Sequence, residues 1–113
     1  MEKFMFIFQG GMASGNQQSP EQMQAHMGKW MAWIDKLSKA GKYLAGEPLL
    51  PGGKLVSGKE KKVTDGPYTE GKEIVGGFFI INAADYNDAV SIAKDCPDYE
   101  YDGSVQVRQV MKM

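Results

Sequence analysis

Two short segments of the sequence are apolar at almost every position, and they constrain the fold most. Residues 4–8 read FMFIF, and residues 76–81 read GGFFII. Successive side chains of a strand point to opposite faces of a sheet, so each segment predicts a strand with apolar side chains on both faces. Any sheet built around these two strands must therefore be covered on both sides.

A helix is indicated by residues 19–22, which read SPEQ. Ser19 suits the N-cap, Pro20 the first helical position, and Gln22 can close a capping box. Apolar residues then recur at spacings of three and four, which predicts one apolar helix face ending at Gly41. The residues of this predicted face are Met23, Met27, Trp30, Met31, Ile34 and Leu37.

The remaining elements are expected in a simple order along the chain. They are a half-polar strand at 42–47, a hairpin around Gly58, a strand at about 74–82, a helix capped by Asp85 and stopped by Pro97, an acidic loop at 98–103, and an alternating strand from residue 104. The order is that of a βαββαβ chain with one inserted hairpin, which predicts a single ferredoxin-like α+β domain over residues 1–113.

This fold leaves one sheet face without a cover. The first and third main strands are expected at the centre of the sheet, and two helices can cover only one of its faces. An exposed apolar face is typical of an interface, and the simplest cover is a second copy packed with two-fold symmetry. We therefore expect a homodimer.

Composition excludes several partners and compartments. The 13 basic and 14 acidic residues give a formal net charge of −1, so neither nucleic acid nor an anionic membrane is an expected partner. The one cysteine, Cys96, cannot form a disulfide within the chain. The first nine residues lack the pattern of a signal peptide, and no apolar run approaches the roughly 20 residues of a membrane span. We expect a cytoplasmic protein.

One extended pattern resembles a known family. It comprises VTDGPYTEGKEIVGGFFIINA at residues 63–83, SPEQM and GEPLLP before it, and DCP and GSVQVRQV after it. The pattern is similar to the YCII-related family, and to its DGPF-domain subgroup with Tyr68 in place of phenylalanine. The resemblance implies a dimeric α+β barrel. It also implies a family in which some members process lactones or chlorocatechols, a His–Asp pair has been proposed as catalytic, and some relatives accompany sigma factors.

His26 is the first candidate for chemistry, because histidine changes charge near neutral pH and this chain has only one. It shares a stripe of the first helix with Trp30, Trp33 and Leu37. It can act as a general base in a pocket between helix and sheet, or lie at the protein boundary hydrogen-bonded to water.

Asp65 is the expected carboxylate partner of His26. An aspartate in a DGP turn normally bonds backbone N–H groups of its own turn, and this explains the residue types without catalysis. The functional alternative is that the turn aims Asp65 into the pocket, where it orients His26.

Further polar and aromatic residues are candidates for substrate binding. Lys72 and Glu73 can clamp a polar substrate, pair across the dimer, or form a solvated rim. Aromatic residues with a few polar groups are typical of small-ligand pockets, but they also build cores. The candidate substrate-binding residues are Trp30, Trp33, Glu47, Tyr68, Lys72 and Glu73.

No metal site and no cofactor are expected. One histidine and one cysteine cannot supply a structural zinc site, and neither a dinucleotide nor a phosphate-loop fingerprint is present. Two hypotheses stay open. The first is a cofactor-independent acid–base enzyme that uses His26 and Asp65 on a small molecule. The second is a non-catalytic dimeric ligand-binding or regulatory module, which family resemblance links to sigma-factor-dependent transcription.

Overall fold

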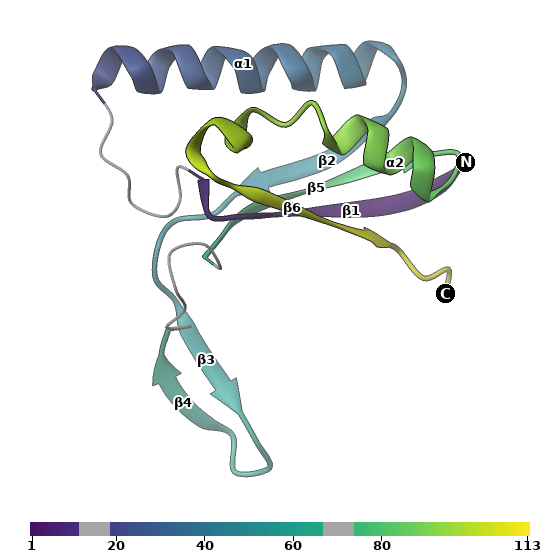
Figure 1. The fold of residues 1–113 in the computed structure, drawn as a ribbon. Coiled ribbons are helices and arrows are strands. Elements are labelled where there is room, and N and C mark those ends of the chain that lie inside the picture. The colour runs from purple at the N-terminus through teal and green to yellow at the C-terminus, as the bar shows by residue number, and fades with distance from the viewer. Residues whose placement is uncertain (12–18, 67–73) are drawn as a thin grey trace.

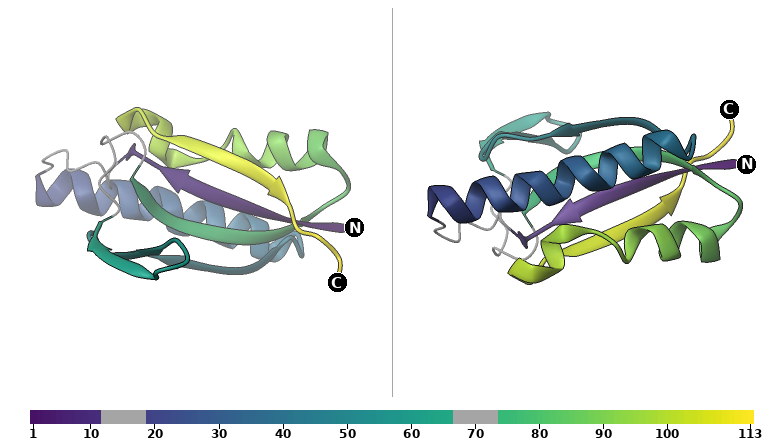
Figure 2. Two further views of the ribbon diagram at one scale, coloured as in Figure 1. Left: turned by 90° about the horizontal axis from the view of Figure 1, so that it is seen from below. Right: turned by 90° about the horizontal axis from the view of Figure 1, so that it is seen from above.

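The computed structural model describes residues 1–11, 19–66 and 74–113. Four antiparallel strands form one sheet in the order β2-β5-β1-β6. Their bounds are Glu2–Gln9 for β1, Tyr43–Pro48 for β2, Val75–Ala83 for β5 and Ser104–Gln109 for β6. Helices α1 (Pro20–Lys39) and α2 (Tyr86–Ala93) both lie on one face of this sheet (Figures 1 and 2). This is the predicted ferredoxin-like α+β arrangement, with β1 and β5 at the centre.

The core lies between the sheet and the two helices. Alternate residues of the central strands point into it, since Phe4 and Phe6 of β1 and Ile81 of β5 are fully buried. Phe79 packs edge to face on Phe8, with ring centroids 4.9 Å apart. Burial of these side chains fixes the register of the sheet, because a slip by one residue would turn all of them outward.

The start of α1 follows the predicted capping pattern. The hydroxyl of Ser19 accepts from the backbone N–H of Gln22, and the side chain of Gln22 accepts from the backbone N–H of Ser19. The helix ends at Lys39, and Gly41 follows with a left-handed φ of 72°.

The face of α1 that meets the core matches the predicted one only in part, since Leu37 is buried and Trp30 and Ile34 pack against the core. Its buried residues are His26, Trp33 and Leu37, while Met23, Met27 and Met31 are 48–59% exposed. The helix is rotated so that the stripe with the two tryptophans faces the sheet. Bulky aromatic side chains bury more apolar surface than methionines, which explains this orientation.

The segment after α2 is more ordered than the expected loop. The cap of α2 is Asp85, as predicted, and its carboxylate accepts from the backbone N–H of Asp88. Residues Pro97–Tyr101 then form a 3-10 helix, η3, in place of an acidic loop. Pro97 occupies its first position, where the missing N–H costs nothing.

The inserted hairpin stands apart from the domain. Strands β3 (Lys54–Ser57) and β4 (Lys62–Asp65) form a separate two-stranded sheet. Figure 1 shows this hairpin projecting away from the sheet on the side opposite the helices. The described residues include no helix with the length and apolar character needed to cross a bilayer.

Candidate functional site

The only histidine lies at the seam between α1 and η3. His26 is 3% exposed, and its Nε2 lies 2.8 Å from Oδ1 of Asp98 in η3. Asp98 itself is 8% exposed. The two residues are 72 positions apart in the sequence, so the fold alone brings them together. A histidine hydrogen-bonded to a buried carboxylate is an arrangement that supports acid–base chemistry.

Two glycines make room for Asp98, one beside its carboxyl group and one beside its backbone carbonyl. Gly11 follows β1 with a φ of 62°, and a Cβ atom built on it would lie 2.5 Å from Oδ2 of Asp98. Gly103 precedes β6, and its backbone N–H donates to the Asp98 carbonyl over 3.0 Å. A Cβ on Gly103 would lie 2.9 Å from that same oxygen. Both positions need glycine because the backbone approaches Asp98 so closely.

Aromatic rings surround the imidazole of His26. The ring of Tyr101 meets it edge to face, with centroids 4.8 Å apart. Nε1 of Trp30 lies 3.0 Å from Nε2 of His26, and Trp30 also packs on Phe8. These contacts hold the plane of the imidazole and exclude water from its edge.

The hydrogen bond to Asp98 decides which nitrogen of His26 can act as a base. An ionised carboxylate only accepts, so Nε2 must carry the proton that it donates to Asp98. The indole N–H of Trp30 can only donate, and it approaches a nitrogen that is already a donor. Nδ1 of the neutral ring then carries the lone pair. Among the described residues this buried atom has no hydrogen-bond partner, so it is the atom available to accept a proton.

Three further residues lie at or beside the seam. Lys29 of α1 and Glu100 of η3 form an exposed ion pair, and the hydrogen bond from Lys29 lowers the pKa of Glu100. Cys96 is buried, and this burial raises the pKa of its thiol to about 12, although a hydrogen bond from the Asp98 backbone opposes the shift. A thiol of that kind stays protonated at neutral pH and is no nucleophile.

The structure does not bring Asp65 to His26 within the chain. Asp65 ends β4 on the projecting hairpin, where its exposed carboxylate forms an ion pair with Lys54 across the two strands. The carboxylate beside His26 belongs to Asp98. Glu47 lies exposed on β2, away from the helix side of the sheet.

The other predicted residues divide into two groups. Trp33 is 5% exposed and belongs to the core, where it stacks on Phe6, whereas Trp30 contacts His26 directly. Tyr68, Lys72 and Glu73 lie outside the described residues.

Sequence reasoning missed Asp98 and Tyr101. Both lie in the segment PDYEYDG, which reads as a loop because it is short and polar. The available signal was Pro97 followed by acidic residues, a pattern typical of the first turn of a helix. Nothing in the local sequence links this turn to His26.

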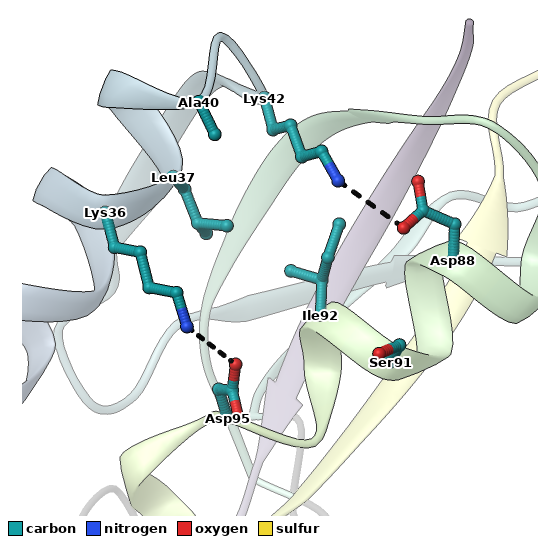
Figure 3. Close-up of a pocket in the computed structure, with 8 residues that line it drawn as sticks. All are labelled: Lys36, Leu37, Ala40, Lys42, Asp88, Ser91, Ile92 and Asp95. Atoms are coloured by element: carbon teal, nitrogen blue, oxygen red, sulfur yellow. Dashed lines mark hydrogen bonds and ion pairs between the residues drawn. The ribbon is translucent and has the colours of Figure 1, made fainter.

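A separate cleft opens between the C-terminal half of α1 and α2 (Figure 3). Its volume is about 220 Å³, and its apolar part is formed by Leu37 and Ile92. Two ion pairs span it, Lys42 with Asp88 at 3.4 Å and Lys36 with Asp95 at 3.5 Å. Since each lysine faces an aspartate, the side chains that line the cleft carry no net charge to attract an ion.

In the part of the chain that the structure describes, no group of three or more histidine, cysteine, aspartate or glutamate side chains is placed to hold a metal ion.

Comparison with known proteins identifies a family and a solved structure of similar fold. The sequence model of the YCII-related domain matches residues 7–113. The fold is similar to that of 5-chloro-2-hydroxyhydroquinone dehydrochlorinase from Burkholderia phenoliruptrix AC1100, solved in complex with 2,5-dihydroxybenzoquinone. The TM-score is 0.50 at 16% sequence identity, and the alignment covers 97% of this chain and 95% of the other. No curated protein matches.

Proposed function

This chain belongs to the YCII-related domain family, and for it we propose a cofactor-independent acid–base reaction on a small hydroxylated ring compound, with Nδ1 of His26 as the base. The observation that carries this proposal is the buried 2.8 Å contact between His26 Nε2 and Asp98 Oδ1. Asp98 replaces Asp65 as the orienting carboxylate, because it is the carboxylate within hydrogen-bonding distance of the ring.

The reaction begins with the neutral imidazole. Asp98 keeps the proton on Nε2, so Nδ1 accepts a proton from a substrate hydroxyl or an acidic C–H. The imidazolium formed in this step lies against the ionised Asp98, which stabilises its charge in a site from which water is largely excluded. Nδ1 then returns the proton to another atom of the substrate. Such a base contributes about 10²- to 10⁴-fold to the rate.

The surroundings of His26 favour a flat and polar substrate. Trp30 and Tyr101 present ring edges and faces to the imidazole, which suits an aromatic or quinonoid ring. The solved structure of similar fold is named as a dehydrochlorinase of a chlorinated hydroxyhydroquinone. Loss of HCl from such a ring needs only proton transfers. Two hydroxyls lose their protons, the ring carbon that bears chlorine gains one, and chloride leaves with the C–Cl bonding pair.

Access to His26 lies along the seam between α1 and η3. The Lys29–Glu100 ion pair joins these two elements at the surface, with side chains 54% and 49% exposed. An exposed pair of this kind contributes little to stability, so parting it costs less than about 1 kcal/mol. A substrate that separates the pair reaches Tyr101, which is half-buried, and then the imidazole.

The test is binding and turnover with defined compounds. 2,5-Dihydroxybenzoquinone is titrated into the protein and binding is followed by its absorbance, while chloride release is measured from 5-chloro-2-hydroxyhydroquinone. We expect the wild-type protein to bind the quinone and release chloride. His26→Gln should lower the rate about 10²- to 10⁴-fold, because glutamine cannot accept the proton.

Two further variants separate catalysis from folding. Asp98→Asn should weaken turnover and change its pH profile, since asparagine no longer holds the proton on Nε2. Asp65→Asn should leave the rate unchanged, because Asp65 is paired with Lys54 on the hairpin. A wild-type protein that neither binds the quinone nor releases chloride would overturn the proposal, as would a folded His26→Gln protein of undiminished rate.

A further inference from the structure

The cleft between α1 and α2 has positive groups on one wall and negative groups on the other. Lys36 and Lys42 line it from the side of α1 (Figure 3). Asp88 and Asp95 line it from the side of α2. The two ion pairs across the cleft, at 3.4 and 3.5 Å, are longer than the about 2.7–2.9 Å of a strong charge-assisted hydrogen bond. All four groups therefore keep capacity for a further hydrogen bond.

Apolar side chains separate the two ion pairs. Figure 3 shows Leu37 of α1 and Ile92 of α2 between them. Asp88 and Asp95 are seven residues apart, along α2 and the turn that follows it. At a rise of 1.5 Å per residue this places them about 10 Å apart. A ligand that reaches both ion pairs must therefore have polar groups at its two ends and an apolar middle.

Asp88 is the more firmly held of the two aspartates. Its Oδ2 accepts a hydrogen bond from the backbone N–H of Ala84 over 2.9 Å, and its own backbone N–H donates to the carboxylate of Asp85. Its Oδ1 faces Lys42 across the cleft. The side chain of Asp88 is half-buried, at 28% exposed. A carboxylate oxygen held in this way is suited to accept from a ligand ammonium group.

Lys36 can move more freely at the other end of the cleft. Its side chain is 73% exposed, and that of its partner Asp95 is 55% exposed. Such an exposed ion pair contributes little to stability. The ammonium group of Lys36 has three donors on a flexible stem, so it can turn from Asp95 to a ligand carboxylate.

The volume of the cleft limits the ligand to a small molecule. About 220 Å³ is room for about seven water molecules at roughly 30 Å³ each. Pockets for drug-sized ligands begin at about 300 Å³. A chain of a few carbon atoms with one polar group at each end is of the size that fits.

We propose that this cleft binds a small zwitterion that has an ammonium group and a carboxylate at opposite ends of a short unbranched carbon chain. Asp88 binds the ammonium group, Lys36 binds the carboxylate, and the methylene groups pack on Leu37 and Ile92. The ligand has no net charge, as the lining of the cleft has none. The site is separate from His26, which does not line this cleft.

The test is a titration with 6-aminohexanoate, followed by the nuclear magnetic resonance signals of the Ile92 methyl groups. Hexylamine and hexanoate each lack one of the two charges, and glycine has both charges too close together to reach the two ion pairs. We expect 6-aminohexanoate to shift the Ile92 signals to saturation. The dissociation constants of the other three compounds should be at least about tenfold higher, which corresponds to about 1.4 kcal/mol.

Variants identify the groups that bind the two charges. Asp88→Asn and Lys36→Met should each raise the dissociation constant of 6-aminohexanoate at least about tenfold. Asp35→Asn is the matched control, because Asp35 pairs with Lys39 on α1 and does not line the cleft, and it should leave that constant unchanged. Thermal unfolding of each variant checks that it is folded.

Three results would overturn the proposal. The first is a wild-type protein whose Ile92 signals do not respond to 6-aminohexanoate. The second is binding of hexylamine or hexanoate as tight as that of 6-aminohexanoate, since the cleft would then not recognise both charges. The third is a loss of affinity in Asp35→Asn equal to that in Asp88→Asn.

Discussion

The two sides of the sheet carry similar chemical groups in opposite surroundings. On the helix side, Asp98 faces His26 in a seam where both are nearly excluded from water. On the other side, Asp65 faces Lys54 on a hairpin open to solvent. The electrostatic attraction between two opposite charges is stronger where water is excluded. In water the same attraction is largely screened. The proposed acid–base chemistry therefore depends on the helix side of the sheet.

The largest test of this contrast compares two consecutive phenylalanines of β5. Phe79 points into the core and is 6% exposed, while Phe78 points to the opposite face of the sheet, which neither helix covers (Figure 2). Phe79→Ala should lower the free energy of unfolding by about 3–5 kcal/mol at any protein concentration. Phe78→Ala should cost only about 1 kcal/mol, because the Phe78 side chain is half-buried.

Urea unfolding of both variants measures these losses. The contrast breaks down if Phe78→Ala costs as much as Phe79→Ala, since the sheet face without helices would then be as well buried as the core.

The second comparison concerns the two aspartates. Asp98→Asn leaves a buried histidine facing an amide and should lower the free energy of unfolding by about 2 kcal/mol. Asp65→Asn removes an exposed ion pair and should lower it by less than about 1 kcal/mol. Thermal unfolding at neutral pH gives both values. Equal losses of unfolding free energy in the two variants would mean that burial of the His26–Asp98 pair does not add to stability.

The third comparison uses two glycines with similar backbone angles. Gly11 has a φ of 62° and lies against the Asp98 carboxyl group, while Gly58 at the hairpin turn has a φ of 74° and open space where a Cβ atom would stand. Alanine costs roughly 1–2 kcal/mol in the left-handed region at either site. Gly11→Ala should cost about 1 kcal/mol more, because its methyl group must displace Asp98.

The rate of the proposed reaction gives a second way to compare the two glycine variants. Gly11→Ala should lower turnover because Asp98 shifts relative to His26, and Gly58→Ala should not change it. Equal turnover in the two variants would show that the position of Asp98 is not critical.

Local sequence rules predicted the elements whose ends are set by local chemistry. The Ser19–Gln22 capping box and the Asp85 cap were confirmed, because caps depend on residues three positions apart. The central place of β1 and β5 was also confirmed, since only central strands need apolar side chains on both faces.

Only one residue of the His26–Asp98 pair could be predicted from the sequence. His26 was found because the chain has one histidine, but its carboxylate lies 72 residues away in a turn that has no conspicuous motif. The DGP turn drew attention to Asp65 for reasons of turn chemistry alone. The rotation of α1 was equally hidden, because Met27 and Met31 lie on an apolar stripe beside that of Trp33 and only packing against the sheet selects one of them.

The smallest expected effect lies on the helix side but near the surface, at Asp88. A hydrogen bond from the backbone N–H of Ala84, and then the nearby Lys42, lower the pKa of Asp88 below its usual 3.8. The contribution of the Asp88 carboxylate to stability is therefore full above the pKa of the unfolded chain, and it is lost as the pH falls through the lower pKa of the folded protein.

Asp88→Asn should lower the free energy of unfolding by less than about 1 kcal/mol at neutral pH, since the ion pair with Lys42 is partly exposed. The gap between wild type and variant should close as the pH falls below about 4. Chemical unfolding across this range measures the gap, and a gap that is constant with pH would show that Asp88 acts through its shape and not through its charge.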